Sequence, residues 1–211
     1  MSLVYPDVSI SNVENGWFVL IDVTVKHIAD ELNQHLKRNF ELDEDVVVVS
    51  SLLEQDGSIP SHVNNKVVAS VVHIQKDTMP HRSQQSSGAS SNRSVVHAQP
   101  VFFNVYVMFS AYFGGSNYQE GLKFISSTIG YFQSQPIFDR SNSPGIPDGI
   151  DKLILDIENL SINDLSNLWG VLGGKYLPSI LYRVRMVAFD SNAIVRQDHV
   201  ASKPEPSVGS I

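Results

Sequence analysis

The run PVFFNVYVMFSAYF, residues 100–113, constrains the fold more than any other stretch of the chain. Two sets of side chains alternate along it, and both are largely apolar: Phe103, Val105, Val107 and Phe109 against Phe102, Asn104, Tyr106 and Met108. A strand with one solvated face would alternate apolar with polar residues, so this pattern predicts a central strand covered on both faces. The chain must therefore supply packing layers on both sides of a sheet.

Apolar side chains recur every three or four residues over residues 18–38 and again over residues 118–133. The first stripe consists of Ile21, Val25, Ile28, Leu32 and Leu36. The second stripe consists of Leu122, Ile125, Ile129 and Phe132. Both stripes predict amphipathic helices that pack on the same sheet.

Four further stretches are typical of strands: residues 46–49, 66–75, 152–160 and 180–189. The first two are rich in β-branched valine, which favours extended backbone. In the third, clean alternation predicts that Leu153, Leu155 and Ile157 face the core. The fold class that follows is α/β (α+β), with a mainly antiparallel or mixed sheet of about five strands and two to three packed helices.

The connecting segments set the domain organisation. Residues 77–99 are dominated by Ser, Gln, Asn and Gly, which predicts a flexible loop that joins two strands as a long hairpin connection. Residues 135–149 contain three prolines and two glycines and are also predicted to be a loop. We expect an N-terminal arm over residues 1–17, one domain over residues 18–189, and a C-terminal tail over residues 190–211.

The segment SINDLSNLWGVLGGKYLPS predicts a short helix followed by a structural corner. Ser161 and Asp164 form a capping-box-like start, and Trp169 is interpreted as a core anchor. The leucines predicted to share its buried side are Leu165, Leu168 and Leu172. Gly173 or Gly174 is predicted to take the left-handed conformation that ends the helix, and Pro178 to turn the chain into the last strand.

The last strand places two cations on one face. Tyr182 and its alternate neighbours face one way, while Arg183 and Arg185 face the other. Two adjacent cations repel each other unless acids or a partner lie opposite them. Asp156 and Glu158 on a neighbouring strand could pair with the arginines internally, and contact with another subunit is the alternative.

Catalytic and metal-binding patterns are weak throughout the sequence. The chain has no cysteine, and no two of its seven histidines have the i, i+4 spacing of a helical zinc pair. LWGVLGGKY, which contains Lys175, invites a phosphate-loop interpretation, but its glycines come at the end of a helix and not before one. We therefore expect no catalytic, cofactor or metal site.

Charge and hydropathy narrow the classes of partner. The net charge is −7, which argues against binding nucleic acid through phosphate neutralisation. Residues 1–60 carry eleven acids and three bases. An acidic face that meets a basic partner is one interpretation of this excess, and a solvated face is the simpler one. No stretch reaches the roughly 18 apolar residues of a membrane span, and the N-terminus lacks a signal-peptide pattern. We therefore expect no nucleic-acid or membrane partner.

Two joined elements resemble a known family. FISSTIGYFQSQPIF at residues 124–138 and LSINDLSNLWGVLGGKYLPSILYRVRM at residues 160–186 resemble the cap, or tube-and-sheath terminator, proteins of phage-tail-like contractile injection systems. The resemblance covers residues 18–188. It implies a sheet-and-helix fold similar to phage tail terminators, and a homo-oligomer that forms a six-membered ring.

The resemblance also implies a structural function without enzyme activity. Such a ring would sit on the last ring of the inner tube protein and the sheath protein, at the end distal to the baseplate. It would assemble in the cytoplasm and become part of a particle. Arg183, Arg185 and Lys175 are the candidate assembly contacts. The alternatives are an adaptor or connector ring of a related tail-like assembly and a small-ligand-binding or enzymatic domain.

Overall fold

A computed structural model describes residues 20–77, 93–97, 102–173, 175–188 and 194–199. The helices are α1 (Leu20–Phe40), η1 (Gly115–Asn117), α2 (Tyr118–Ser134) and α3 (Ile162–Val171). The strands are β1 (Val47–Val49), β2 (Lys66–Lys76), β3 (Arg93–His97), β4 (Phe103–Tyr112), β5 (Ile137–Asp139), β6 (Ile150–Ile157), β7 (Ser179–Ala188) and β8 (Ile194–His199). The predicted arm, residues 1–17, lies outside the described residues.

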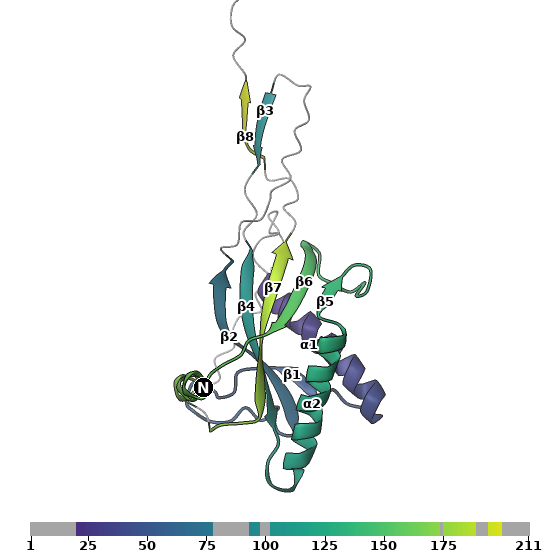
Figure 1. The fold of residues 1–211 in the computed structure, drawn as a ribbon, viewed down its shortest axis with the longest axis vertical. Coiled ribbons are helices and arrows are strands. Elements are labelled where there is room, and N and C mark those ends of the chain that lie inside the picture. The colour runs from purple at the N-terminus through teal and green to yellow at the C-terminus, as the bar shows by residue number, and fades with distance from the viewer. Residues whose placement is uncertain (1–19, 78–92, 98–101, 174, 189–193, 200–211) are drawn as a thin grey trace, which may run out of the picture.

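Six strands form one mixed sheet in the order β1-β2-β4-β7-β6-β5 (Figure 1). Strand β1 pairs with β2 in parallel, and the other four pairings are antiparallel. The predicted fold class is confirmed, with six strands in this sheet instead of about five. Strands β2 and β4, which precede and follow the predicted loop 77–99, pair with each other antiparallel.

Strand β4 is central, as the two-sided apolar pattern predicts. Val105, Val107 and Phe109 belong to a core on one face of the sheet. Met108 belongs to a second cluster on the other face. Because adjacent side chains of a strand point to opposite faces, the two clusters are separate layers that share one sheet.

Helices α1 and α2 cover the first face, which we call the helix face (Figure 1). Val25, Ile28, Leu32 and Leu36 are buried and Ile21 is partly buried, which confirms the stripe predicted for α1. The stripe predicted for α2 is wrong at Leu122, which is exposed. The buried side of α2 is rotated toward residues that include Gly121, Phe124 and Thr128.

One buried asparagine attaches α1 to the edge of the sheet. Asn33 Oδ1 accepts hydrogen bonds from the backbone N–H of Val46 (3.0 Å) and of Val47 (2.8 Å). Its Nδ2 donates to the carbonyl of Val47 at 2.9 Å. The amide thus satisfies backbone groups at the outer edge of β1, where no further strand lies within the described residues.

Helix α3 covers part of the opposite face, which we call the outer face (Figure 1). Trp169 is buried there with Leu52, Val68, Met108 and Leu181. The three predicted leucines, Leu165, Leu168 and Leu172, are partly buried in the same cluster, so the predicted buried side of α3 is confirmed.

Three predictions for the connecting segments need correction. The predicted loop 135–149 contains β5, a three-residue edge strand that pairs with β6. The predicted loop 77–99 contains β3, and the predicted tail 190–211 contains β8; these two strands pair with each other beyond the ends of β4 and β7 (Figure 1). Ile157 lies opposite Tyr182 and so faces the core side of the sheet as predicted, but it is 37% exposed because it lies at the end of β6, beyond the reach of β5.

Candidate functional site

The corner between β6 and β7 forms as the sequence predicts. Ser161 Oγ accepts a hydrogen bond from the Asp164 N–H (3.2 Å) and donates one to the Asp164 carboxylate (2.7 Å). This cap satisfies an N–H that the first turn of a helix leaves without a partner. Gly173 ends the helix with φ of +65°, the left-handed conformation that glycine adopts without steric cost.

The chain after the helix is held between α3 and the sheet. Tyr176 packs edge-on against Trp169, with ring centroids 5.8 Å apart. The carbonyl of Pro178 accepts a hydrogen bond from the Ala111 N–H at 2.9 Å, which attaches the turn to β4. Lys175 is exposed, and Gly174 lies outside the described residues. The corner thus fixes where β7 begins.

Arg183, on the outer face of β7, is paired within the chain. Its guanidinium lies 3.5 Å from the Asp156 carboxylate and 3.9 Å from that of Glu158. All three side chains are between one third and one half exposed, so solvent screens these attractions. The internal pairing considered from the sequence is present, and it leaves the guanidinium open to a further contact.

Arg185 has different surroundings. It lies 3.6 Å from the carboxylate of Asp77, whose side chain is 4% exposed. Asp77 stands where the chain leaves β2, and its N–H donates to the Phe102 carbonyl (2.8 Å) just before β4 begins. The pair therefore joins the end of β7 to the end of β2. Sequence analysis missed Asp77 because a lone aspartate at a loop boundary has no distinguishing pattern.

The two arginines belong to two rows of residues that cross the outer face. Asp156, Arg183, Tyr106 and His73 form one row, and Ile154, Arg185, Asn104 and Gln75 form the next. Three buried polar atoms on these rows have no hydrogen-bond partner: Asn104 Oδ1 and the Nε atoms of both arginines. Unsatisfied buried groups are few in folded proteins.

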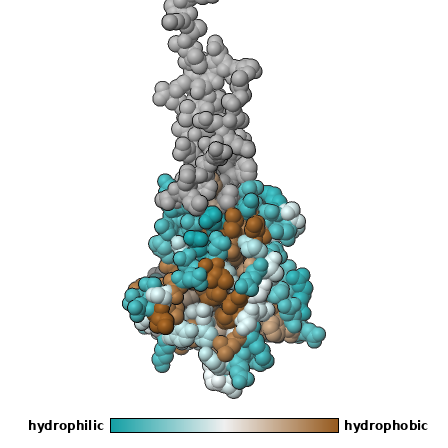
Figure 2. Space-filling view, viewed as in Figure 1, coloured by the Kyte–Doolittle hydropathy of each residue, from teal (hydrophilic) through white to brown (hydrophobic). Residues whose placement is uncertain are grey.

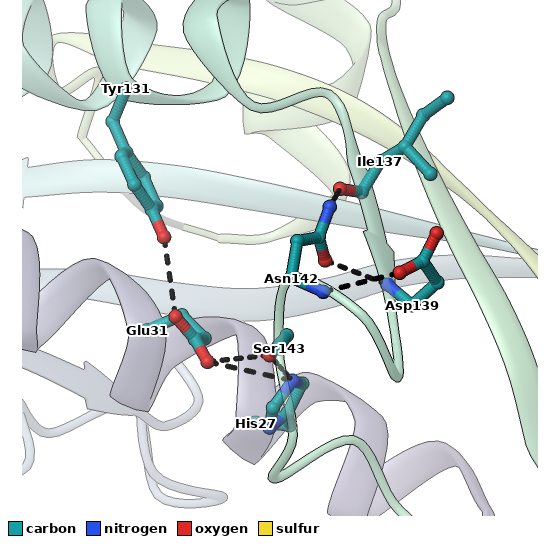
Figure 3. A network of polar contacts seen from close by, with 7 residues as sticks. All are labelled: His27, Glu31, Tyr131, Ile137, Asp139, Asn142 and Ser143. Carbon is teal, nitrogen blue, oxygen red and sulfur yellow. Dashed lines mark hydrogen bonds and ion pairs between the residues drawn. The ribbon is translucent and has the colours of Figure 1, made fainter.

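A polar network ties α1 to the loop after β5 (Figure 3). Ser143 Oγ donates to Glu31 Oε1 (2.5 Å), and His27 Nε2 lies 2.8 Å from the same hydroxyl. Because a hydroxyl has one proton, His27 Nε2 must carry the proton of the second bond. Tyr131 donates to the other carboxylate oxygen of Glu31 at 3.4 Å.

The loop that delivers Ser143 is held by its own hydrogen bonds (Figure 3). Asn142 Nδ2 donates to the Ile137 carbonyl (2.8 Å), and its Oδ1 accepts from the Asp139 N–H (2.9 Å). The Asp139 carboxylate accepts from the hydroxyl and the N–H of Ser141, and these bonds lower the pKa of Asp139. The network is thus built on a fixed turn.

A serine, a histidine and a glutamate in contact resemble a hydrolase triad in composition only. In a triad the acid orients the histidine through its second ring nitrogen. Here Glu31 accepts the proton of Ser143 instead, and Ser143 is fully buried. Burial also lowers the pKa of His27, against the opposing effect of Glu31 and Asp30. The arrangement is a structural clamp between α1 and the β5 loop.

The acidic turn after α1 lines a hollow of about 450 Å³ but is internally paired. Lys37 lies 2.7 Å from Asp45, and Lys66 lies 3.7 Å from Glu44. Within the described residues, no group of three or more histidines or carboxylates is placed to hold a metal ion. None of the described helices combines the length and apolar composition that crossing a membrane requires.

The fold and these surfaces define a mixed-sheet α+β domain with helices on both faces. A protein-family model described as the Pvc16 N-terminal domain matches residues 24–203. The chain therefore belongs to the Pvc16 N-terminal domain family. A search of curated proteins finds no match.

The solved structures that are similar to the chain include two components of injection systems. One is the sheath/tube terminator of an extracellular contractile injection system, PVC, in the extended state, with 19% identity and a TM-score of 0.47. The other is the tube-terminating cap of the anti-feeding prophage, with 13% identity and a TM-score of 0.44. Each alignment covers 90% of this chain, but only 62% and 60% of the respective solved chains.

Proposed function

We propose that this chain is a structural cap that terminates the inner tube and the contractile sheath of a phage-tail-like injection particle. The observation that carries the proposal is the family match, which spans residues 24–203 and so includes the whole six-stranded sheet. The proposed cap acts through shape and surface contacts and not as an enzyme. The fully buried serine of the His27–Ser143–Glu31 clamp agrees with that assignment.

The proposed cap is a ring of identical subunits, six in number, at the end distal to the baseplate. Its partners are the inner tube protein and the sheath protein, with no nucleic acid and no membrane. It assembles in the cytoplasm and is then part of the particle. Arg183 and Lys175, together with Arg185, are the proposed assembly contacts. Arg183 supports this role best, because its pairs with Asp156 and Glu158 are half solvated and exchange readily for a partner carboxylate.

Deleting the gene tests the proposal. We expect particles of uncontrolled length or with unstable sheath in electron micrographs, because nothing would stop tube growth or hold the sheath. Complementation with Arg183→Glu should leave the defect in place, whereas Lys26→Glu, a charge reversal on an exposed position of α1, should restore uniform particles. Uniform, stable particles from the deletion strain would refute the proposal.

The adaptor or connector ring is distinguished by the proteins that accompany the cap. Purified caps should carry both tube and sheath protein if the proposal is right. Tube protein without sheath protein, from a strain that makes both, would favour the adaptor instead.

A further inference from the structure

The sheet has an open edge on each side within the described residues. Strand β1 pairs only with Val67–Ala69 of β2, so Val71–Lys76 has no neighbouring strand on that side. At the other side β5 pairs only with residues 152–154 of β6, so Asp156 and Ile157 are open. Open edges present unpaired backbone N–H and C=O groups to any strand that fits them.

Backbone direction matches at the two edges. The Val67 N–H points away from β4 and donates to the Val46 carbonyl. The backbone groups of alternate residues in a strand point to the same side, so the N–H and C=O of Val71 also point away from β4. On β6 the Leu155 N–H points away from β7 and donates to the Pro136 carbonyl, so the N–H and C=O of Ile157 also point away from β7. Each edge therefore offers the donor and acceptor of one residue at an open position.

Val71 and Ile157 are the two ends of one row across the sheet. Val71 lies opposite Val107, Val107 opposite Tyr182, and Tyr182 opposite Ile157. Val107 and Tyr182 belong to the core of the helix face, so Val71 and Ile157 point to that face too. They are 40% and 37% exposed, which is high for β-branched residues at the ends of a buried row.

A bulge enlarges the apolar surface at the β2 edge. The register shifts between Val71 and His73, so Ile74 lies opposite Val105 and also faces the helix side. Ile74 is 45% exposed, next to Val71. Without the extra residue, the side chains of Val71 and Ile74 would point to opposite faces of the sheet, because they are three positions apart.

The neighbouring row ends in a histidine at the β2 edge and in an acid at the β6 edge. His73 lies opposite Tyr106, Tyr106 opposite Arg183, and Arg183 opposite Asp156, all on the outer face. The open part of β2, VVHIQK, carries a histidine and a lysine and no acid. The open end of β6 is followed by Glu158, so acids predominate there. On the face of the molecule shown in Figure 2, apolar side chains, in brown, gather in patches between polar side chains.

We propose that the β2 edge of one copy of this chain lies against the β6 edge of the next copy, head to tail. Val71 then packs on Ile157, and His73 faces Asp156. The two edges differ from each other, so the contact is heterologous and repeats from copy to copy until a ring closes. The inference rests on one part of the proposed function, the association of several copies of the chain.

Engineered cysteines test the contact directly, because the natural chain has none to interfere. The full chain with Val71→Cys and Ile157→Cys is oxidised and run on a non-reducing gel. We expect a ladder of covalent oligomers that ends at the closed ring. Each single variant should give no species beyond a dimer. The matched control pairs Val71→Cys with Ile162→Cys on α3, which is 86% exposed, and should give no ladder.

Native mass spectrometry of the unmodified chain separates the possible failures. Oligomers without a specific ladder would overturn the edge contact and leave the proposed cap intact. Monomers at every concentration tested would overturn the edge contact and also weigh against a ring. In particles, a cross-link from the variant cysteines to another protein instead of a second copy would overturn it as well.

A charge exchange provides a second test at the same positions. Val71→Lys should abolish association, because it places a cation against Ile157. Adding Ile157→Glu should restore it, since the new lysine and glutamate then face each other across the contact. Equal association of all these variants would contradict the proposal.

Discussion

Arg183 and Arg185 are two residues apart on one strand face, yet their surroundings give them different roles. Asp156 and Glu158 meet Arg183 in a screened environment, whereas Asp77 meets Arg185 while almost fully buried. Removing one member of a buried ion pair leaves a charge that solvent cannot compensate. Arg185 is therefore the arginine that the fold needs.

Substituting each arginine by glutamine should separate these roles. Arg185→Gln is expected to lower the free energy of unfolding by about 3 kcal/mol, because it removes the ion pair of a buried carboxylate. Arg183→Gln is expected to lower it by no more than about 1 kcal/mol. Urea denaturation measures both. Adding Asp77→Asn to Arg185→Gln should recover part of the loss, and equal losses for the two arginines would contradict the assignment.

His27 should make stability depend on pH. Burial lowers its pKa, so the unfolded chain, with an ordinary histidine pKa near 6.5, binds the proton more tightly. The contribution is complete above about pH 6.5 and is lost as the pH falls from there to the folded pKa. We expect His27→Gln to reduce the loss of stability between about pH 7.5 and 5.5, measured from urea midpoints.

His35 provides the internal control for this effect. Burial, and then the charge of Arg38, also lower its pKa, so some pH dependence should remain in His27→Gln. The double variant with His35→Gln should reduce it further. A slope that neither substitution changes would show that these histidines do not govern acid sensitivity in this range.

At the scale of the element, helix α3 contains Gly170 and ends at Gly173, and these two glycines differ in backbone conformation. Gly173 has φ of +65°, while Gly170 is helical and has open space where a Cβ would stand. A Cβ on Gly173 would make only an ordinary contact with Leu53, so the backbone conformation is the constraint.

Alanine at these two glycines should act in opposite directions. Gly173→Ala is expected to lower the free energy of unfolding by about 1–2 kcal/mol, because alanine disfavours the left-handed region. Gly170→Ala is expected to raise it by up to about 1 kcal/mol through helix propensity. Thermal denaturation of both variants tests the pair. A stabilising Gly173→Ala would show that the corner can form without the left-handed residue.

The elements with strong periodicity were predictable from the sequence, and the short or polar ones were not. The apolar pattern repeats over at least two turns in helices α1 and α3 and over several residues in strand β4. Strand β5 has three residues beside a proline, too few to show alternation. Strands β3 and β8 lie in polar segments and pair with each other, a pairing that local pattern cannot reveal.

The candidate site was predictable only where one segment carries it. The arginine face and the Trp169 corner could be predicted because their residues are adjacent in sequence. His27 and Glu31 share a helix at a spacing of four, which hinted at contact, but nothing near Ser143 marks it as their partner. The face of Ile157 was predictable but its exposure was not, because alternation gives the face of a residue and not whether a neighbour covers it.

At the scale of the whole molecule, one sheet connects two apolar clusters. Val67 and Ala69 belong to the helix-face core, while Val68 between them belongs to the cluster under α3. Loss of packing on either face therefore destabilises the same strands. We expect the two layers to unfold together.

Truncating Trp169 tests this coupling. Trp169→Ala is expected to lower the free energy of unfolding by about 3–5 kcal/mol, because it opens a large cavity under α3. Unfolding should remain a single transition, with coincident curves from circular dichroism and tyrosine absorbance. Separate transitions would show that the helix-face core survives alone. Leu172→Ala, at a partly buried position of the same cluster, should cost less.

The β3–β8 ladder has a consequence for the order of folding. It pairs residue 93 with residue 199, so forming it alone would require closing a loop of about one hundred residues. The pairing of β4 with β7 brings the neighbouring parts of the chain together first and shortens that loop. We therefore expect the ladder to form after the sheet.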